Sequence, residues 1–381
     1  MPDGFALQGG YIVKTPFNLE SYLVNGVEDI VSGILKATLH NPKESSFMAR
    51  YAIQSRRANK LRAAAQEDRH HIPPFLIASI TTQCNLHCKG CYARANHSCY
   101  DQDSTGNAPQ QLSAEQWGHI FGQAADLGIG FILLAGGEPF VRRDVLTIAG
   151  DYPGILFPVF TNGTMIDSDY LTLLDQKRNL VPIISIEGEQ KATDARRGAG
   201  IYQRLHSAMR ELHSRGLLFG ASITVTKENL GEVLSDSFIS ELSASGCKAI
   251  IYVEYVPIDH RTAHLALDDE TRSLMTQKLD DARERHSDLL MVSFPGDEKK
   301  SGGCLAAGRG FFHINAFGGA EPCPFSPYSD INVADTSLSE ALQSRLFQKL
   351  QQQGNLTQEH IGGCVLFAQE AQVKLLLKEP V

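Results

Sequence analysis

The sequence predicts an α/β fold built on a parallel sheet, and two observations lead to this prediction. From residue 75 onward, short apolar runs alternate with longer amphipathic stretches. The motifs that carry chemistry follow directly after the apolar runs. Repeated β–α units give parallel sheets, whose functional loops lie at the carboxyl ends of the strands. We expect strands at 75–80, 131–135, 156–161, 181–186, 219–225 and 249–256.

Helices are expected between these strands. The first of them has a capping box, in which Ser113 precedes Gln116 by three residues at the start of an amphipathic stretch. The helices are predicted near 113–127, 144–151, 168–176, 201–215, 232–244 and 268–286.

Two further helices are predicted before the first strand. Residues 17–40 carry apolar side chains at helical spacing. A second helix begins at "NPKE", where Asn41 can cap and Pro42 suits the first turn. Its basic residues predict either a solvated face or a surface for an acidic partner or a membrane. These residues are Arg50, Arg56, Arg57, Lys60 and Arg62.

Composition narrows the class of protein. The chain has 381 residues and a formal net charge of −8, which argues against a stable nucleic-acid partner. Its first residues, "MPDGFALQGG", have neither the basic region nor the apolar core of a signal peptide. No apolar run is long enough to span a bilayer. We therefore expect a cytoplasmic protein, in which clustered cysteines indicate metal ligands before disulfides.

Three of the eight cysteines lie close together in "CNLHCKGC", directly after the first expected strand. Cys84, Cys88 and Cys91 suit three irons of a [4Fe–4S] cluster, with the fourth iron left open for a small molecule. A zinc site, which usually takes four ligands, is the competing interpretation. Gly90 within the loop permits close approach of the backbone.

This cysteine motif resembles the CxxxCxxC motif of radical S-adenosylmethionine (SAM) enzymes. The resemblance implies a partial (β/α)6 barrel, a [4Fe–4S] cluster, and reductive cleavage of SAM to a 5′-deoxyadenosyl radical that abstracts hydrogen from a substrate. The residue before the third cysteine is often aromatic in that family, whereas here it is Gly90 and an aromatic residue, Tyr92, follows the cysteine.

Four more stretches resemble the SAM-binding motifs of the family: "GGEP" after the second strand, "TNGT" after the third, "SIEG" with "ARRG" after the fourth, and "VEYVPI" at the sixth. Glu187 stands where the family often has aspartate. The resemblance implies that SAM contacts Tyr92, Gly136, Gly137, Glu138, Pro139, Thr161, Asn162, Ser185, Glu187, Arg197 and Val256.

The C-terminal part is similar to SPASM and twitch extensions, which carry auxiliary [4Fe–4S] clusters. Cys304, Gly318 and Cys323 have the spacing with which such an extension opens, and "HINAFGGAEPC" predicts a β-hairpin. Only Cys364 follows, so the extension is shortened and its cluster takes Cys304, Cys323 and Cys364. Cys99, another side chain or the substrate remains open as the fourth ligand.

These expectations divide the chain into an N-terminal helical region (1–74), a radical SAM barrel (75–295) and an auxiliary-cluster extension (296–381). The resemblance implies an oxidoreductase or maturase acting on a peptide or protein side chain. A small-molecule substrate (a sugar, nucleoside or lipid) and a non-catalytic electron carrier are the alternatives. The electron donor is expected to be of the flavodoxin or ferredoxin type. Candidate catalytic residues are Cys99, Glu254 and Tyr255.

Overall fold

A computed structural model describes most of the chain. The described residues are 5–8, 11–14, 18–39, 41–67, 70–100, 110–258, 260–294, 302–354, 356 and 364–378. Near the N-terminus, β1 (Phe5–Gln8) and β2 (Tyr11–Lys14) pair as an antiparallel hairpin. Among the described helices, none combines the length and the apolar character that crossing a membrane requires.

The main sheet confirms the predicted α/β fold. Its described strands run in the order β11-β10-β3-β4-β5-β6-β7-β8-β9. All neighbours pair in parallel except β10 and β11. The strands are β3 (Phe75–Thr81), β4 (Phe131–Gly136), β5 (Phe157–Thr161), β6 (Leu180–Ser185), β7 (Gly220–Val225), β8 (Ala249–Glu254), β9 (Leu290–Phe294), β10 (Phe311–Ile314) and β11 (Ala320–Glu321).

The sheet curves into a partial barrel. All six strands expected from the sequence are present, and β9 extends the parallel series by a strand that was not expected. The rings of Phe294 on β9 and Phe311 on β10 lie 5.5 Å apart, centroid to centroid. Because β9 and β10 stand near opposite ends of the sheet, this contact brings the two ends of the barrel together on its inner side.

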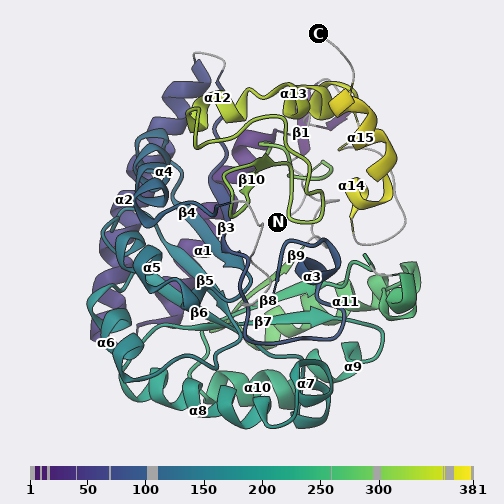
Figure 1. Cartoon of the computed structure of the whole chain (residues 1–381). Coiled ribbons are helices and arrows are strands. Elements are labelled where there is room, and N and C mark those ends of the chain that lie inside the picture. Colours follow the sequence, from purple (N-terminus) through teal and green to yellow (C-terminus); the bar gives the residue numbers. More distant parts are fainter. Residues whose placement is uncertain are drawn as a thin grey trace.

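Helices form an outer ring around the strands (Figure 1). The capping box at Ser113 and Gln116 is present at the start of the first helix of this ring. A short helix at 190–197 was not expected, because its sequence has no apolar face. The ring contains α4 (Ala114–Leu127), α5 (Arg143–Ala149), α6 (Ser168–Gln176), α7 (Gln190–Arg197), α8 (Ile201–Ser214), α9 (Leu230–Val233), α10 (Asp236–Ala244) and α11 (Asp269–Arg285).

The two N-terminal helices, α1 (Leu19–Ala37) and α2 (Pro42–Glu67), cover the amino-terminal ends of the strands. Val27 and Val31 of α1 share a buried cluster with Phe131 and Leu290, the first residues of β4 and β9. Burial of this apolar surface fixes the helices to the barrel.

The predicted basic face of α2 needs one correction. Arg62 is buried and donates a hydrogen bond to the carbonyl of Gly128, so it serves the packing of α2 against the barrel. The other four basic residues of this helix are exposed, namely Arg50, Arg56, Arg57 and Lys60.

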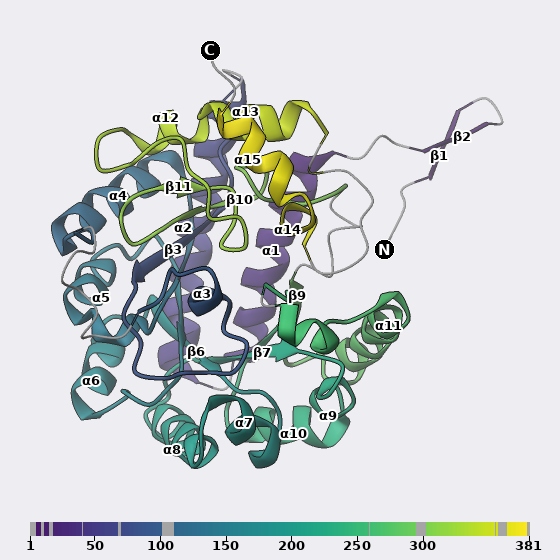
Figure 2. The same cartoon turned by 45° about the vertical axis from the view of Figure 1, so that its right-hand side comes forward.

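The C-terminal part packs on the open side of the barrel (Figure 2). The predicted β-hairpin is present as β10 and β11, and β10 continues the barrel sheet through its pairing with β3. Phe312 of β10 contacts Phe347, and the surrounding buried core is continuous with that of the barrel. The helices here are α12 (Leu338–Leu342), α13 (Arg345–Gln352), α14 (Val365–Ala368) and α15 (Glu370–Lys378).

Candidate functional site

The three clustered cysteines lie on one loop between β3 and the short helix α3 (Tyr92–Ala95). The backbone N–H of Cys91 donates to the carbonyl of Cys88 at 3.3 Å. The side chains are partly exposed, and Cys88 has both other thiols as electrostatic neighbours. No three His, Cys, Asp or Glu side chains of the described residues converge as the ligands of one metal ion do. Three thiolates on one loop suit a cubane, in which each thiolate binds a different iron.

The "GGEP" stretch ends β4 and presses against the start of the cysteine loop. The N–H of Gly137 donates to the carbonyl of Thr81 at 2.8 Å, and the N–H of Glu138 donates to that of Gln83 at 2.7 Å. A Cβ on Gly137 would collide with the carbonyl group of Gln83. Glycine at this position therefore allows the two strand ends to meet.

The Glu138 carboxylate organises the ends of three strands. It is 1% exposed and accepts hydrogen bonds from Thr161 Oγ1 (2.8 Å), the Asn162 N–H (2.7 Å) and the Phe140 N–H (3.0 Å). Burial raises the pKa of Glu138 to about 7, although these hydrogen bonds oppose the shift. A buried carboxylate without a cation is costly, so the site is suited to an ammonium group.

The "TNGT" stretch connects β5 to the cysteine loop. Asn162 Nδ2 donates to Asn85 Oδ1 at 2.7 Å, and Asn85 Nδ2 donates to Thr164 Oγ1 at 2.8 Å. Asn85 directly follows Cys84, so these amides help to hold the loop over the barrel.

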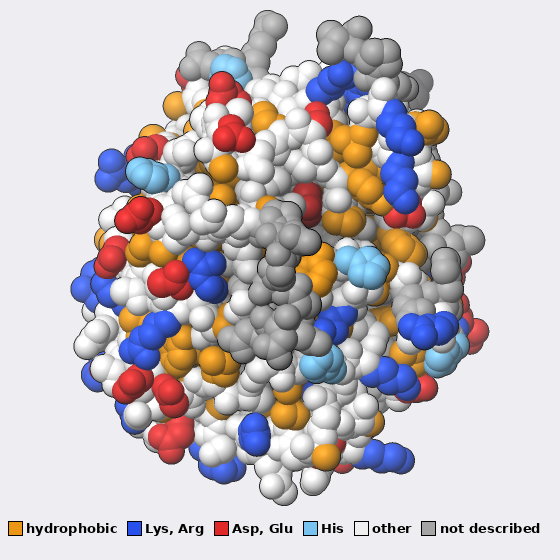
Figure 3. Space-filling view, viewed as in Figure 1, with side chains coloured by type: hydrophobic (Ala, Val, Ile, Leu, Met, Phe, Trp, Pro, Cys, Tyr) orange, Lys and Arg blue, Asp and Glu red, His pale blue; other side chains and the backbone are white. Residues whose placement is uncertain are grey.

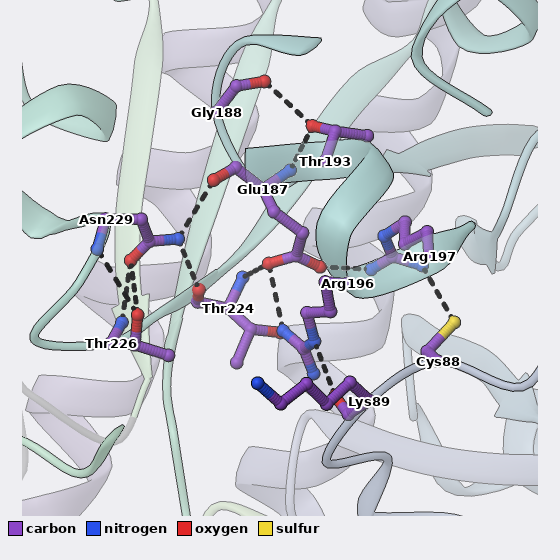
Figure 4. Close-up of polar contacts among 10 residues, drawn as sticks. All are labelled: Cys88, Lys89, Glu187, Gly188, Thr193, Arg196, Arg197, Thr224, Thr226 and Asn229. Carbon is purple, nitrogen blue, oxygen red and sulfur yellow. Dashed lines mark hydrogen bonds and ion pairs between the residues drawn. The ribbon is translucent and has the colours of Figure 1, made fainter. Parts of the chain in front are cut away.

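Glu187 is the centre of a second polar cluster, drawn in Figure 4. Its carboxylate, 2% exposed, pairs with the guanidinium of Arg196 at 2.9 Å and with that of Arg197. The N–H of Thr224 on β7 donates to the same carboxylate at 3.1 Å. Asn229 Nδ2 donates to the carbonyl of Glu187 at 2.9 Å. The carboxylate of Glu187 therefore contacts protein groups, and it orients the side chains of the two arginines of α7.

Both arginines reach the cysteine loop. Arg196 Nε donates to the carbonyl of Lys89 at 3.2 Å, and Arg197 Nη1 lies 3.9 Å from Cys88 Sγ (Figure 4). The Nε of Arg197 is buried and has no hydrogen-bond partner among the described residues. A buried donor without an acceptor is costly, and a carboxylate would satisfy it. Arg197 is therefore placed to pair with the carboxylate of SAM. The carboxylate of Glu187 instead pairs with Arg196 and Arg197.

Tyr255 lies against the loop at the position where the usual aromatic residue is missing. A Cβ at Gly90 would be 2.7 Å from Tyr255 Oη and 3.2 Å from its ring. The hydroxyl is 2.6 Å from Thr262 Oγ1, and Tyr255 is 4% exposed. Glu254 has a different place, because it pairs with Arg272 of α11 on the outer side of β8.

Two of the residues expected at the site face the C-terminal part. The ring of Tyr92 is 5.1 Å from that of Phe325, and burial raises the pKa of Tyr92. Cys99 is buried and hydrogen-bonded to Cys84, which lowers the pKa of Cys84 to about 6. Cys99 is thus beside the first cysteine of the motif.

The remaining expected contacts lie at strand ends. Ser185 is the last residue of β6, and Pro139 begins a buried turn after β4. Val256 follows β8, is buried, and its carbonyl accepts from the N–H of Ile258 at 3.0 Å. Gly136 adopts a φ of +114°, which only glycine tolerates readily.

The three C-terminal cysteines are buried near one another. Cys323 follows β11 and is hydrogen-bonded to Cys364, and Cys304 is a further electrostatic neighbour. Burial raises the pKa of Cys323 well above its usual value. The N–H of Cys304 donates to the carbonyl of Leu356 at 2.7 Å. Three thiols from separate segments of the chain are therefore neighbours in the fold.

Residues 78–235 match the model of the Radical SAM superfamily. The chain thus contains a radical SAM domain over these residues. As a radical SAM enzyme, it uses SAM and a [4Fe–4S] cluster. Its C-terminal part is similar to the extensions of the SPASM or twitch kind.

Three known proteins illustrate the similarity. An AdoMet-dependent heme synthase of Methanosarcina barkeri is 27% identical over 73% of this chain and 84% of its own length. A PqqA peptide cyclase of Rhizobium meliloti is 26% identical over 70% of this chain and 73% of its own length. The crystal structure of Streptococcus suis SuiB bound to precursor peptide SuiA has a TM-score of 0.59 at 17% identity, and covers 80% of this chain and 71% of SuiB.

Sequence reasoning missed several residues of the site. Arg196 was given no role of its own, and Asn85 was not considered. Asn85 carried a usable signal, since it is a polar residue inside the cysteine motif. Asn229 and Thr224 carried none, because their contacts with Glu187 depend on the packing of β6 against β7.

Proposed function

We propose that this radical SAM enzyme oxidises a side chain of a peptide or protein. The observation that carries the proposal is the joining of three elements at one edge of the barrel: the loop with three cysteines, the buried Glu138 and the unpaired Nε of Arg197. Together they offer thiolates for a cluster, an anion for an ammonium group and a cation for a carboxylate. These are the groups needed to hold the cluster and the methionine part of SAM.

We propose that Cys84, Cys88 and Cys91 hold the cluster. When bound and reduced, the cluster with SAM supplies a 5′-deoxyadenosyl radical, which removes a hydrogen atom from an unreactive C–H bond. The protein orients SAM through Glu138 and Arg197, and the buried strand ends keep water from the methionine part of the site. The side chain of Tyr255 packs against the cysteine loop at Gly90.

For the C-terminal extension, we propose an auxiliary [4Fe–4S] cluster on Cys304, Cys323 and Cys364. The three thiols are buried close together, and thiolates gathered in this way are the ligands that iron–sulfur clusters use. A flavodoxin or ferredoxin type of protein in the cytoplasm would supply the electron for SAM cleavage. We further propose that the exposed basic residues of α2 contact an acidic partner or a membrane surface.

A peptide substrate is favoured by two of the similar proteins, whose names or structures include peptides. Charged side chains of both signs are mixed on the face seen in Figure 3, so the surface there does not select for a polyanion. A tetrapyrrole is the second candidate, because the heme synthase of Methanosarcina barkeri matches this chain over most of both lengths.

One experiment separates these substrates. The full chain is reconstituted with iron and sulfide without oxygen, reduced with dithionite, and given SAM with either a randomised octapeptide library or iron coproporphyrin III. Cys84, Cys88 and Cys91 replaced together by Ala serve as the control. We expect 5′-deoxyadenosine from the parent protein only, and peptides that have lost two hydrogens. Turnover of the tetrapyrrole alone would contradict the peptide proposal, and no 5′-deoxyadenosine would contradict the radical chemistry.

A further inference from the structure

A row of three polar side chains crosses the wall of the barrel and begins beside the strand that ends in the GGEP stretch, because Ser79 pairs with Ala135. Glu321 Oε2 lies 2.7 Å from His313 Nδ1, and His313 Nε2 lies 2.8 Å from Ser79 Oγ. The other oxygen of Glu321 accepts from Asn315 Nδ2 at 2.6 Å. Glu321 and His313 are each 4% exposed, whereas Ser79 is half-buried. A carboxylate, an imidazole and a hydroxyl in this order are the arrangement of a proton-transfer triad.

Hydrogen-bond chemistry fixes which atoms carry protons. An ionised carboxylate only accepts hydrogen bonds, so His313 Nδ1 carries the hydrogen that is shared with Glu321. In the neutral imidazole, Nε2 then holds a lone pair and accepts the hydroxyl hydrogen of Ser79. His313 is thus oriented as a base towards Ser79.

The hydroxyl end of the row faces the interior of the barrel. Side chains alternate across a strand, so Ser79 lies on the face of β3 opposite to Ala78 and Ile80, which are buried in one cluster with Trp117 of the outer helix α4. On β10, His313 shares a face with Phe311, which contacts Phe294 across the barrel. Among the described residues, Ser79 Oγ forms its hydrogen bond with His313.

The position of the row relates the two groups of cysteines. Ser79 stands five residues before Cys84 on the strand that leads into the cysteine loop. Glu321 stands two residues before Cys323, at the end of β11. The row thus joins the strand that leads into the first group of cysteines to the strand that leads into Cys323.

We propose that Ser79, His313 and Glu321 form a proton relay that deprotonates the substrate during its oxidation, an inference that rests on the proposed function. In the protein loaded with both clusters and SAM, the substrate would give one hydrogen atom to the 5′-deoxyadenosyl radical. The resulting substrate radical would lose one electron to the oxidised auxiliary cluster that Cys304, Cys323 and Cys364 would hold, and one proton to Ser79 Oγ, as the proton of Ser79 passes to His313 Nε2. Glu321 Oε2, 2.7 Å from His313 Nδ1, holds the ring in the orientation in which Nε2 faces Ser79. Two electrons and two hydrogens leave the substrate in total, and a new double bond or ring bond forms in it.

Ser79 is the group that touches the substrate, whereas His313 and Glu321 act through it. The competing explanation is that the row only anchors β10 to β3. An anchor would affect folding, and it would change SAM cleavage and substrate oxidation together. A relay affects substrate oxidation after the hydrogen atom has been removed, so the two explanations predict different ratios of products.

The first test reads the protonation of His313 directly. The full chain, with clusters assembled and labelled with ¹⁵N-histidine, is measured by NMR without oxygen, and His313→Gln identifies the signal. We expect a neutral ring with hydrogen on Nδ1, and a shift at Nε2 in Ser79→Ala. Hydrogen on Nε2 of a neutral ring, or an imidazolium in the resting enzyme, would overturn the relay.

The second test measures oxidised peptide formed per 5′-deoxyadenosine, with the randomised octapeptide library as probe. For Ser79→Ala and His313→Gln we expect the amount of oxidised peptide per 5′-deoxyadenosine to fall at least about 100-fold, the usual scale of acid–base catalysis. Ser293→Ala, which removes a buried hydroxyl from β9, is the matched control. Imidazole added to His313→Gly should restore oxidation, which an anchor cannot explain. An unchanged ratio in both variants would refute the relay, whereas no oxidised peptide from the parent would instead refute the peptide proposal.

Discussion

The hydroxyl of Tyr255 occupies the space beside Gly90 into which any side chain at residue 90 would project. Tyr255 comes from the end of β8 and Gly90 from the cysteine loop, so the contact spans the barrel mouth. Gly90 also has a φ of +69°, which strains every residue with a Cβ. The aromatic side chain that the loop lacks is thus replaced by one from a different strand.

Substitution of Gly90 by Ala should destabilise the loop for both reasons. We expect a loss of about 1–2 kcal/mol from the left-handed backbone alone, and a further loss from the contact with Tyr255 Oη. Iron content and 5′-deoxyadenosine formation should fall in this variant. In Gly90→Ala combined with Tyr255→Phe, part of the loss should be recovered because the hydroxyl is gone. If the second substitution recovers nothing, Tyr255 is not the obstacle.

Glu187 should be far more important for stability than an exposed acid with an arginine partner. Glu187→Gln leaves two buried guanidinium groups without their counter-charge, and breaking such a pair costs about 3–5 kcal/mol. Asp280, half-exposed and paired with Arg283 at 3.0 Å, is the matched control, and Asp280→Asn should cost about 1 kcal/mol or less. Denaturant unfolding of the SAM-free protein measures both values.

The same substitution should also weaken SAM binding, because Arg197 loses the partner that aims it. Glu187→Asp, which keeps the charge on a shorter side chain, should retain more affinity than Glu187→Gln. Equal SAM affinity in Glu187→Gln and the parent protein would mean that Arg197 does not bind the SAM carboxylate.

The sequence predicted the strands and the motifs at their ends, because buried parallel strands and cysteine spacing are local signals. It did not predict the partners of those motifs. Glu187 was expected to contact SAM, yet its carboxylate pairs with Arg196 and Arg197, which lie nine and ten residues further along the chain. Glu254 was a catalytic candidate, yet the alternation of β8 turns it towards Arg272.

The link between His313 and Ser79 was beyond sequence reasoning for a similar reason. The two residues are 234 positions apart and meet only because β10 pairs with β3. Strand order is decided by packing of the whole sheet, and no short pattern encodes it.

The raised pKa of Glu138 predicts opposite pH dependences for two properties. A carboxyl whose pKa is about 7 when folded and 4.5 when unfolded binds more protons in the folded state between these values. Its contribution to the free energy of unfolding therefore falls as the pH rises from 4.5 to about 7. The ionised form is the one that attracts the SAM ammonium, so SAM affinity should increase over the upper part of this range.

Below pH 7, the affinity should fall by about tenfold per pH unit, the limit for one proton. Isothermal titration calorimetry with the cluster-loaded protein between pH 6 and 7.5 checks this, with Glu138→Gln as the comparison. The variant should bind SAM more weakly and without this slope. A parent protein whose affinity is flat across the range would exclude Glu138 as the ammonium ligand.

Cys99 offers a test of how the cluster is tuned. Its thiol is hydrogen-bonded to Cys84, and hydrogen bonds to cluster sulfurs stabilise the more negative, reduced state. Cys99→Ala should therefore leave the iron content unchanged and move the reduction potential of the SAM-binding cluster to a more negative value. Electrochemical titration followed by electron paramagnetic resonance measures the potential, and Cys247→Ala, which removes a buried thiol hydrogen-bonded to Ala249, is the control. A loss of iron in Cys99→Ala would instead make Cys99 a cluster ligand. Deuterium transfer from heavy water to 5′-deoxyadenosine that disappears in this variant would make it a hydrogen-atom donor.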